Sequence, residues 1–128
     1  MITNRKPDRQ KSDALKKMAE VTLERLKKTD AEKYPSNTLL DYYDTIHKLM
    51  DALALRNGVT IKGEGAHREL IDHISKEHMN EQTRQFLQNM MEHRNRISYE
   101  GFMIQTDYII ANRDRIQNII KTLFSLLK

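Results

Sequence analysis

Apolar residues recur every three or four positions along most of this chain, the spacing that places them on one face of a helix. Glycine or proline interrupts the pattern at several points. The expected helices are residues 8–28, a helix that follows a break at residues 34–37 and stops at Asn57-Gly58, residues 66–78, a segment from Asn80 to Arg94, and a long last helix after Gly101. The pattern predicts an all-α fold, an up-and-down bundle of four to five helices.

The segments between the helices carry little hydrophobic pattern. Residues 1–7 are expected to be frayed, and residues 58–65, which hold three of the four glycines, are expected to be a flexible connector. Gly58 can adopt the left-handed conformation that ends a helix, and Asn80 can cap the next-to-last one. A turn is predicted around residues 98–101.

The last helix has a broader apolar face than one small bundle needs. Its predicted core residues are Ile109, Ile116, Ile120, Leu123 and Leu127, and Ile119, Phe124 and Leu126 widen the face. Part of this helix, or of the fourth, could therefore form an interface between two copies of the chain, since symmetric dimers are the commonest oligomers.

Composition narrows the class of protein. A chain of 128 residues is expected to form one domain, and the absence of cysteine excludes disulfides and thiolate zinc sites. No apolar run approaches the eighteen or so residues of a membrane span, and the start lacks the hydrophobic stretch of a signal peptide. We expect a cytoplasmic protein without a membrane segment.

The net charge of +4 arises entirely from residues 1–30, which hold nine Lys/Arg and five Asp/Glu. This basic first helix could attract phosphate at modest salt. A solvated helix face is the simpler explanation, so the charge by itself does not predict a nucleic-acid binder.

Arg94 breaks the local pattern. Met91, Met90 and Leu87 lie three, four and seven residues before it, on the same face of the predicted helix. The side chain of Arg94 should therefore lie on the buried face. A guanidinium keeps its charge and is costly to desolvate unless it is paired or lines a cleft that receives anions. Arg94 is therefore predicted either to pair with an acid of the second helix, such as Asp44 or Asp51, or to mark a site.

Neither a metal nor a cofactor is predicted. His73 and His78 lie about 140° apart around a helix, and His67 and His78 lie three turns apart, so neither pair can chelate one ion. The glycine-rich segment 58–65 lacks the Gly-Lys-Ser/Thr ending of a phosphate loop. Tyr42 and Tyr43, adjacent on the second helix, are expected to be core residues rather than a base-stacking platform.

Three local patterns, together with the order of helices, resemble the HEPN family. They are Tyr42-Tyr43-x-x-x-His47 before the exit glycine Gly58, the helix start Ala66-His67-Arg68-Glu69-Leu70-Ile71, and Arg94-Asn95-Arg96-Ile97-Ser98-Tyr99. The third resembles the family signature of arginine, a polar neighbour, a spacer of four to six residues and histidine. The resemblance spans about residues 34–127, and residues 1–128 are expected to form a single HEPN-like helical domain.

The resemblance implies a homodimeric, metal-independent endoribonuclease. In active members an arginine and a histidine from each protomer meet at the dimer cleft, orient the scissile phosphate and assist attack by the RNA 2′-hydroxyl. On this chain the corresponding site residues are Arg94, Asn95 and Tyr99, and Arg96 and His93 are candidates for additional phosphate binding.

The departure from the signature lies at Tyr99, where the family has histidine. A phenol with an ordinary pKa near 10 is a poor base at pH 7. Loss of a general base lowers a rate on the order of 100- to 10,000-fold, so cleavage is expected to be weak or absent. Tyr99 could also be helped by a histidine from elsewhere, such as His93, or could simply pack its ring while its hydroxyl reaches water.

Two functions stay open at this point. One is a homodimer that binds RNA or a nucleotide at an Arg94/Tyr99 cleft. The other is a non-catalytic helical-bundle interaction protein, for example the partner of a nucleotidyltransferase in a toxin–antitoxin pair. In such pairs a tyrosine near the signature is modified, which makes Tyr99 a candidate acceptor.

Overall fold

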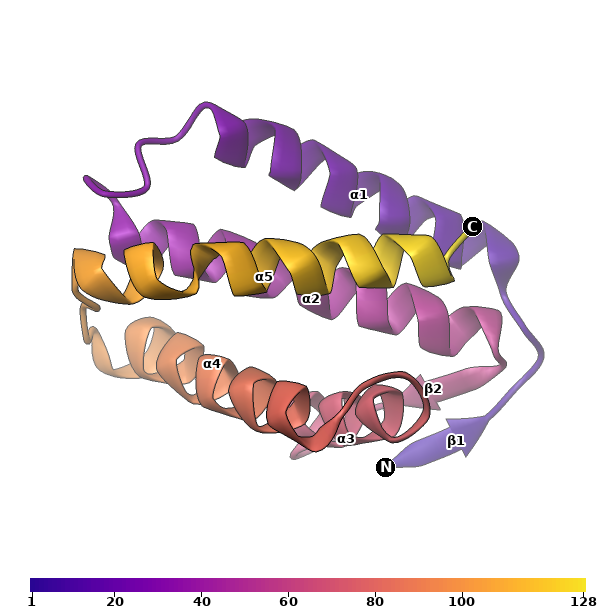
Figure 1. The fold of residues 1–128 in the computed structure, drawn as a ribbon. Helices are drawn as coiled ribbons and strands as arrows, with labels where there is room; N and C mark the ends of the chain where they lie inside the picture. The colour runs from indigo at the N-terminus through magenta and orange to yellow at the C-terminus, as the bar shows by residue number, and fades with distance from the viewer.

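Five helices and two short strands make up the fold, and the computed structural model describes all 128 residues (Figure 1). In chain order the elements are β1 (Ile2–Asn4), α1 (Arg9–Lys27), α2 (Pro35–Arg56), β2 (Val59–Ile61), α3 (Ala66–His78), α4 (Glu81–Glu100) and α5 (Thr106–Leu126). The all-α bundle predicted from the hydrophobic spacing is confirmed. None of the helices has the length and apolar character that crossing a membrane requires.

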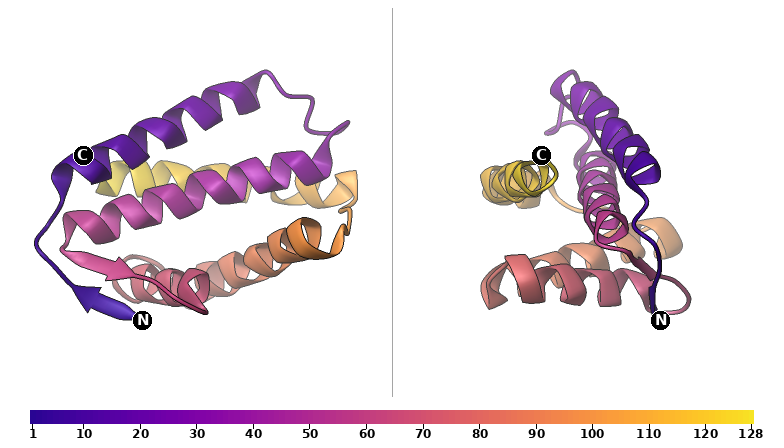
Figure 2. Two further views of the ribbon diagram at one scale, coloured as in Figure 1. Left: turned by 180° about the vertical axis from the view of Figure 1, so that it is seen from behind. Right: turned by 90° about the vertical axis from the view of Figure 1, so that its right-hand side faces the viewer.

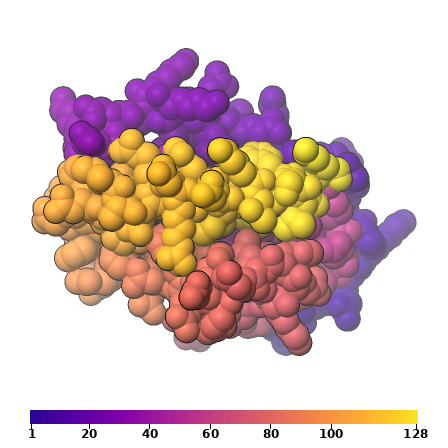
Figure 3. All heavy atoms as spheres, viewed as in Figure 1, coloured from indigo at the N-terminus to yellow at the C-terminus, as the bar shows by residue number.

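Helix α2 is the centre of the bundle, because each of the other four helices packs against it. Helix α1 lies along one side of α2, the α3–α4 pair lies along the other, and α5 crosses between them (Figures 1 and 2). The space-filling view shows α5 covering the middle of the face that is turned toward the viewer in Figure 1 (Figure 3). A helix contacted on so many sides must be apolar on most of its circumference, and 13 of the 22 residues of α2 are buried.

The core contains the stripes that the hydrophobic pattern predicted. Tyr42 and Tyr43 are buried, as expected of core residues. The predicted stripe residues buried on α3, α4 and the C-terminal part of the chain are Leu70, Ile71, Ile74, Phe86, Leu87, Met90, Met91, Ile109, Ile116, Ile120, Leu123 and Leu127.

The fourth helix is longer than predicted. It was expected to end at Arg94 before a turn around residues 98–101, but α4 continues to Glu100 and ends at Gly101, which has φ +68°. Residues 95–100 contain neither glycine nor proline, so nothing stops the helix earlier. The extra turn matters because it keeps Tyr99 on the same helix as Arg94. At the other end, Asn80 caps α4 as predicted, accepting a 2.8 Å hydrogen bond from the Thr83 backbone N–H.

The predictions for residues 1–7 and 58–65 were wrong. Residues Ile2–Asn4 are not frayed but form β1, which pairs antiparallel with β2, a strand within the supposed flexible connector. The register places Ile2 opposite Ile61. The pairing uses backbone hydrogen bonds between segments far apart in sequence, and the β1 side chains are exposed, so no hydrophobic pattern could reveal it.

Candidate functional site

Arg94 lies near the C-terminal end of α4, half-buried, at a small cavity where α2, α3 and α4 meet. The cavity has a volume of about 260 Å³. Its lining residues are Leu40, Asp41, Tyr43, Asp44, His47, His67, Arg94 and Ser98. We call this cavity the Arg94 cleft.

The Arg94 guanidinium has polar and aromatic neighbours but no carboxylate partner. Its Nη1 donates to Asn95 Oδ1 at 3.1 Å and to the Tyr99 hydroxyl at 3.3 Å. Its central carbon lies 6.0 Å from the centre of the Tyr43 ring and 5.6 Å from that of Tyr99. The positive charge of this side chain is therefore held by hydrogen bonds and aromatic faces and stays available to an anion.

The alternative in which Arg94 pairs with an acid of α2 is not what the structure shows. Asp44 pairs with Lys48 one turn further along the same helix, at 2.6 Å. Asp51 forms no ion pair with Arg94 and does not line the cleft. The sequence pattern located the unusual arginine correctly but could not tell which neighbours the second and third helices would bring to it.

Two histidines form the opposite wall of the cleft. The His47 ring from α2 stacks on the His67 ring from the first turn of α3, with centroids 4.0 Å apart and 24° between planes. Nδ1 of His67 shares a 3.0 Å hydrogen bond with the hydroxyl of Tyr43. His47 makes no hydrogen bond within the chain, and neither does Nε2 of His67, so these nitrogens are available to a ligand.

Burial and the nearby guanidinium keep this wall uncharged. Burial, together with the neighbouring His47 imidazole and the Arg94 guanidinium, lowers the pKa of His67 to about 4. Burial also lowers the pKa of His47, although Asp44 opposes this change. Burial raises the pKa of the Tyr43 phenol above its ordinary value, with Arg94 acting in the opposite direction. At pH 7 the Arg94 guanidinium thus lies beside neutral imidazole and phenol groups. The two carboxylates of the lining, Asp41 and Asp44, pair with Arg25 and Lys48 instead.

The structure gathers some of the predicted site residues and separates others. Arg94, Asn95 and Tyr99 lie together, joined by the two hydrogen bonds from the guanidinium. The Tyr99 side chain is not packed, because 76% of the residue is exposed. Arg96 and His93 do not line the cleft. Arg96 lies over the Phe102 ring at 4.0 Å, and His93 stacks on Tyr108 of α5 at 4.8 Å.

Sequence reasoning gave no site role to His47 and His67. His47 lies four residues after Tyr43, so the two share a face of α2, and that spacing was the available signal. His67 reaches the same place only because β2 and the following turn bring α3 back onto α2. No group of three or more histidine, aspartate or glutamate side chains is arranged to hold a metal ion.

The cleft combines the Arg94 guanidinium, which forms no ion pair, with two neutral imidazoles, the Tyr43 phenol and the carboxylates of Asp41 and Asp44 around a small cavity, and Tyr99 lies beside it. Guanidinium binds phosphate by paired hydrogen bonds, and imidazole can accept or donate a proton. The arrangement therefore suits a phosphate ester better than a metal ion or an apolar ligand. Comparisons of the chain with protein-family models, with curated proteins and with solved structures found no match.

Proposed function

We propose that this chain is a HEPN-like homodimer that binds RNA or a nucleotide through phosphate at the Arg94 cleft, with weak or absent metal-independent cleavage. The observation that carries the proposal is the Arg94 guanidinium, half-buried and without an ion pair, facing two stacked imidazoles across one cavity. A half-buried arginine without an acid is costly unless an anion compensates its charge.

Weak cleavage follows from the proton chemistry available in the cleft. Attack of a 2′-hydroxyl on phosphorus forms the 2′-O–P bond, breaks the P–O5′ bond, and needs a base for the 2′ proton and an acid for the departing oxygen. The Tyr99 phenol is a poor base. His67 is neutral and free at Nε2, but a pKa of about 4 makes it a weak base as well.

The homodimer is supported by exposed apolar residues that lie close to Tyr99 in the sequence. Four of the nine exposed large hydrophobic residues lie between positions 99 and 110, around the end of α4 and the start of α5; they are Tyr99, Phe102, Met103 and Ile110. Exposed apolar residues gathered near a site favour a protein contact there. A second copy docked on this end of the bundle would lie next to both Tyr99 side chains.

The test of RNA binding compares two arginines of equal charge. Fluorescence anisotropy with a 5′-labelled single-stranded RNA should give an affinity that falls at least tenfold in Arg94→Ala. It should change less than twofold in Arg9→Ala, an exposed arginine of the basic α1. Equal losses in the two variants would show that general positive charge binds the RNA, and would contradict the proposal.

Cleavage is tested separately from binding. The same RNA, incubated in EDTA, should yield at most slow formation of 2′,3′-cyclic phosphate ends, and Arg94→Ala should abolish whatever rate is present. A rate that Arg94→Ala leaves intact would assign the cleavage to a contaminant or to another site.

The interaction-protein alternative is favoured by one observation, the 76% exposure of Tyr99. The exposed side chain can be reached by a nucleotidyltransferase, as the modified tyrosine of a toxin–antitoxin pair would have to be. Incubation with such an enzyme and ATP, followed by peptide mass spectrometry, should then place a nucleotidyl group on Tyr99 and on no other tyrosine. A modified Tyr34, which is also exposed, would show that accessibility alone selects the residue.

A further inference from the structure

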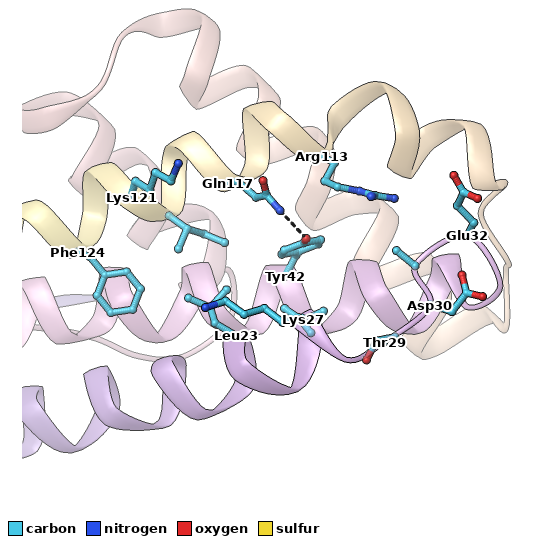
Figure 4. Close-up of a pocket in the computed structure, with 13 residues that line it drawn as sticks. Leu23, Lys27, Thr29, Asp30, Glu32, Tyr42, Arg113, Gln117, Lys121 and Phe124 are labelled. Atoms are coloured by element: carbon cyan, nitrogen blue, oxygen red, sulfur yellow. Dashed lines mark hydrogen bonds between the residues drawn. The ribbon is translucent and has the colours of Figure 1, made fainter.

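A second and larger cavity lies on the other side of α2, between α1, α2 and α5 (Figure 4). Its volume is about 620 Å³, within the range of sites for small organic ligands. It exists because α1 and α5 both pack on α2 but make little contact with each other. We call it the α1–α5 groove.

The floor of the groove is apolar. Tyr42 of α2 forms its centre, with Leu23 and Leu26 of α1 on one side and Ile120 and Phe124 of α5 on the other. Leu23 and Phe124 face each other at one end of the groove, away from the chain segment between α1 and α2 (Figure 4). This end offers a slot for a hydrocarbon chain.

The rim carries three cations without acidic partners. Lys27 of α1 and Arg113 and Lys121 of α5 line the groove, and none of them forms an ion pair. The Nε of Arg113 is buried and has no hydrogen-bond partner, which is a cost that the folded chain itself does not offset. Two acids, Asp30 and Glu32, lie at the opposite end from the apolar slot, the end toward which Arg113 extends (Figure 4), and form no ion pair with these cations.

Polar groups lie at the middle of the groove. Gln117 of α5 donates a 3.3 Å hydrogen bond to the Tyr42 hydroxyl, and the side chains of Lys121 and Arg113 leave α5 on either side of Gln117 (Figure 4). A carboxylate beside Tyr42 and Gln117 would meet the hydroxyl and lie within reach of both flexible cations. A chain attached to it would run over Leu23 and Phe124.

We infer that the α1–α5 groove binds an amphipathic anion of the fatty-acid class, with its carboxylate among Lys27, Arg113 and Lys121 and its hydrocarbon chain in the slot. The charge complementarity and the shape of the groove together select this ligand, since an apolar ligand would leave the three cations uncompensated and an inorganic anion would leave the slot empty. The inference does not depend on the function of the Arg94 cleft.

The experiment uses laurate below its micellar concentration, titrated calorimetrically into the full chain, with dodecanol as the uncharged ligand of equal chain length. Laurate should bind saturably with one site per chain and at least tenfold more tightly than dodecanol. The double variant Arg113→Met/Lys121→Met should lose at least tenfold in laurate affinity, whereas Arg9→Met, which removes one charge from the outer part of α1, should change it less than twofold.

Folding of the variant is checked by its thermal midpoint. Methionine keeps an apolar stem and removes the unpartnered Nε of Arg113, so the double variant should be at least as stable as the parent chain. Equal affinities for laurate and dodecanol, unsaturable uptake, or an equal loss in Arg9→Met would each overturn the inference. So would a self-association through the groove that Phe124→Glu abolishes and laurate does not displace.

Discussion

At the scale of single residues, the chemistry of the Arg94 cleft is set by which polar groups lose water on folding. Tyr43 is 1% exposed, and its hydroxyl has one partner, the Nδ1 of His67. A buried hydroxyl without a partner would be costly, so the two side chains stabilise each other's burial. The same burial takes the pKa of His67 far below the ordinary 6.5, to about 4.

The first prediction concerns the titration of His67. Its imidazole signals in NMR should move with a midpoint near pH 4. Between pH 4 and 6.5 the unfolded chain binds more protons at this residue than the folded chain does, so its contribution to stability is complete above about pH 6.5 and is lost as pH falls toward 4.

Urea denaturation at pH 7 and pH 5 checks this sign. The parent chain should lose more stability over this interval than His67→Asn, which has no imidazole to protonate. Asp51, whose pKa burial raises, acts with the opposite sign in both proteins. A variant that loses as much stability as the parent chain would contradict the lowered pKa of His67.

A second prediction at this scale uses the two neighbouring tyrosines of α2. Tyr43→Phe removes the partner of His67 Nδ1 and should lower the free energy of unfolding by about 1 kcal/mol. Tyr42→Phe removes a longer contact, 3.3 Å from Gln117 Nε2, and should have a smaller effect. Urea denaturation of both variants measures the difference, and the reverse order would count against the hydrogen bond with His67.

At the scale of elements, the fold of the N-terminal segment depends on contacts with residues that are distant in sequence. The β1–β2 pairing continues into the hydrogen bond from the Arg5 backbone N–H to the Gly58 oxygen at 2.7 Å. Gly58 has φ +76°, and a Cβ there would lie 2.5 Å from the Arg5 carbonyl oxygen. Glycine is thus required at this point both for the backbone conformation and for the approach of the N-terminal segment.

Gly58→Ala and Gly101→Ala separate these two requirements. Both residues have positive φ, but a Cβ on Gly101 meets nothing within 4 Å. Gly101→Ala should therefore lower the free energy of unfolding by about 1 kcal/mol from backbone strain, and Gly58→Ala should lower it by more. Hydrogen exchange at the amides of residues 59–61 should also accelerate in Gly58→Ala alone. Similar effects in both variants would mean that the close approach of Arg5 contributes nothing.

At the scale of the whole molecule, the exposed apolar residues around the end of α4 lead to a prediction about assembly. Light scattering should give twice the chain mass at micromolar concentration. Met103→Glu, which places a charge where the residue is now 71% exposed, should give a monomer. Met18→Glu is the matched control on the outer face of α1 and should leave the dimer intact. A monomeric parent chain would contradict the proposed homodimer.

The helices could be predicted from the sequence because their signals are local. The spacing of apolar residues gave α1 and α3 nearly to the residue, and Asn80 marked the start of α4. Helix α2 begins at Pro35, inside the break expected at residues 34–37, because proline is tolerated in the first turn of a helix. The position of Arg94 on an apolar helix face was also visible in the local spacing of the sequence. The rest could not be predicted in this way, because it arises from the packing of helices against one another. His67 joins His47, and β1 joins β2, only once α3 and the N-terminal segment have folded back onto α2.

Tyr42 and Tyr43 are consecutive residues, about 100° apart around α2, and each lines a different cavity. One turn of one helix is therefore the common wall of the Arg94 cleft and the α1–α5 groove. A ligand that binds in one cavity and displaces this turn changes the free energy of binding in the other cavity. Thermodynamic linkage makes the effect reciprocal. The factor by which a nucleotide alters the uptake of an amphiphile must then equal the factor by which the amphiphile alters that of the nucleotide.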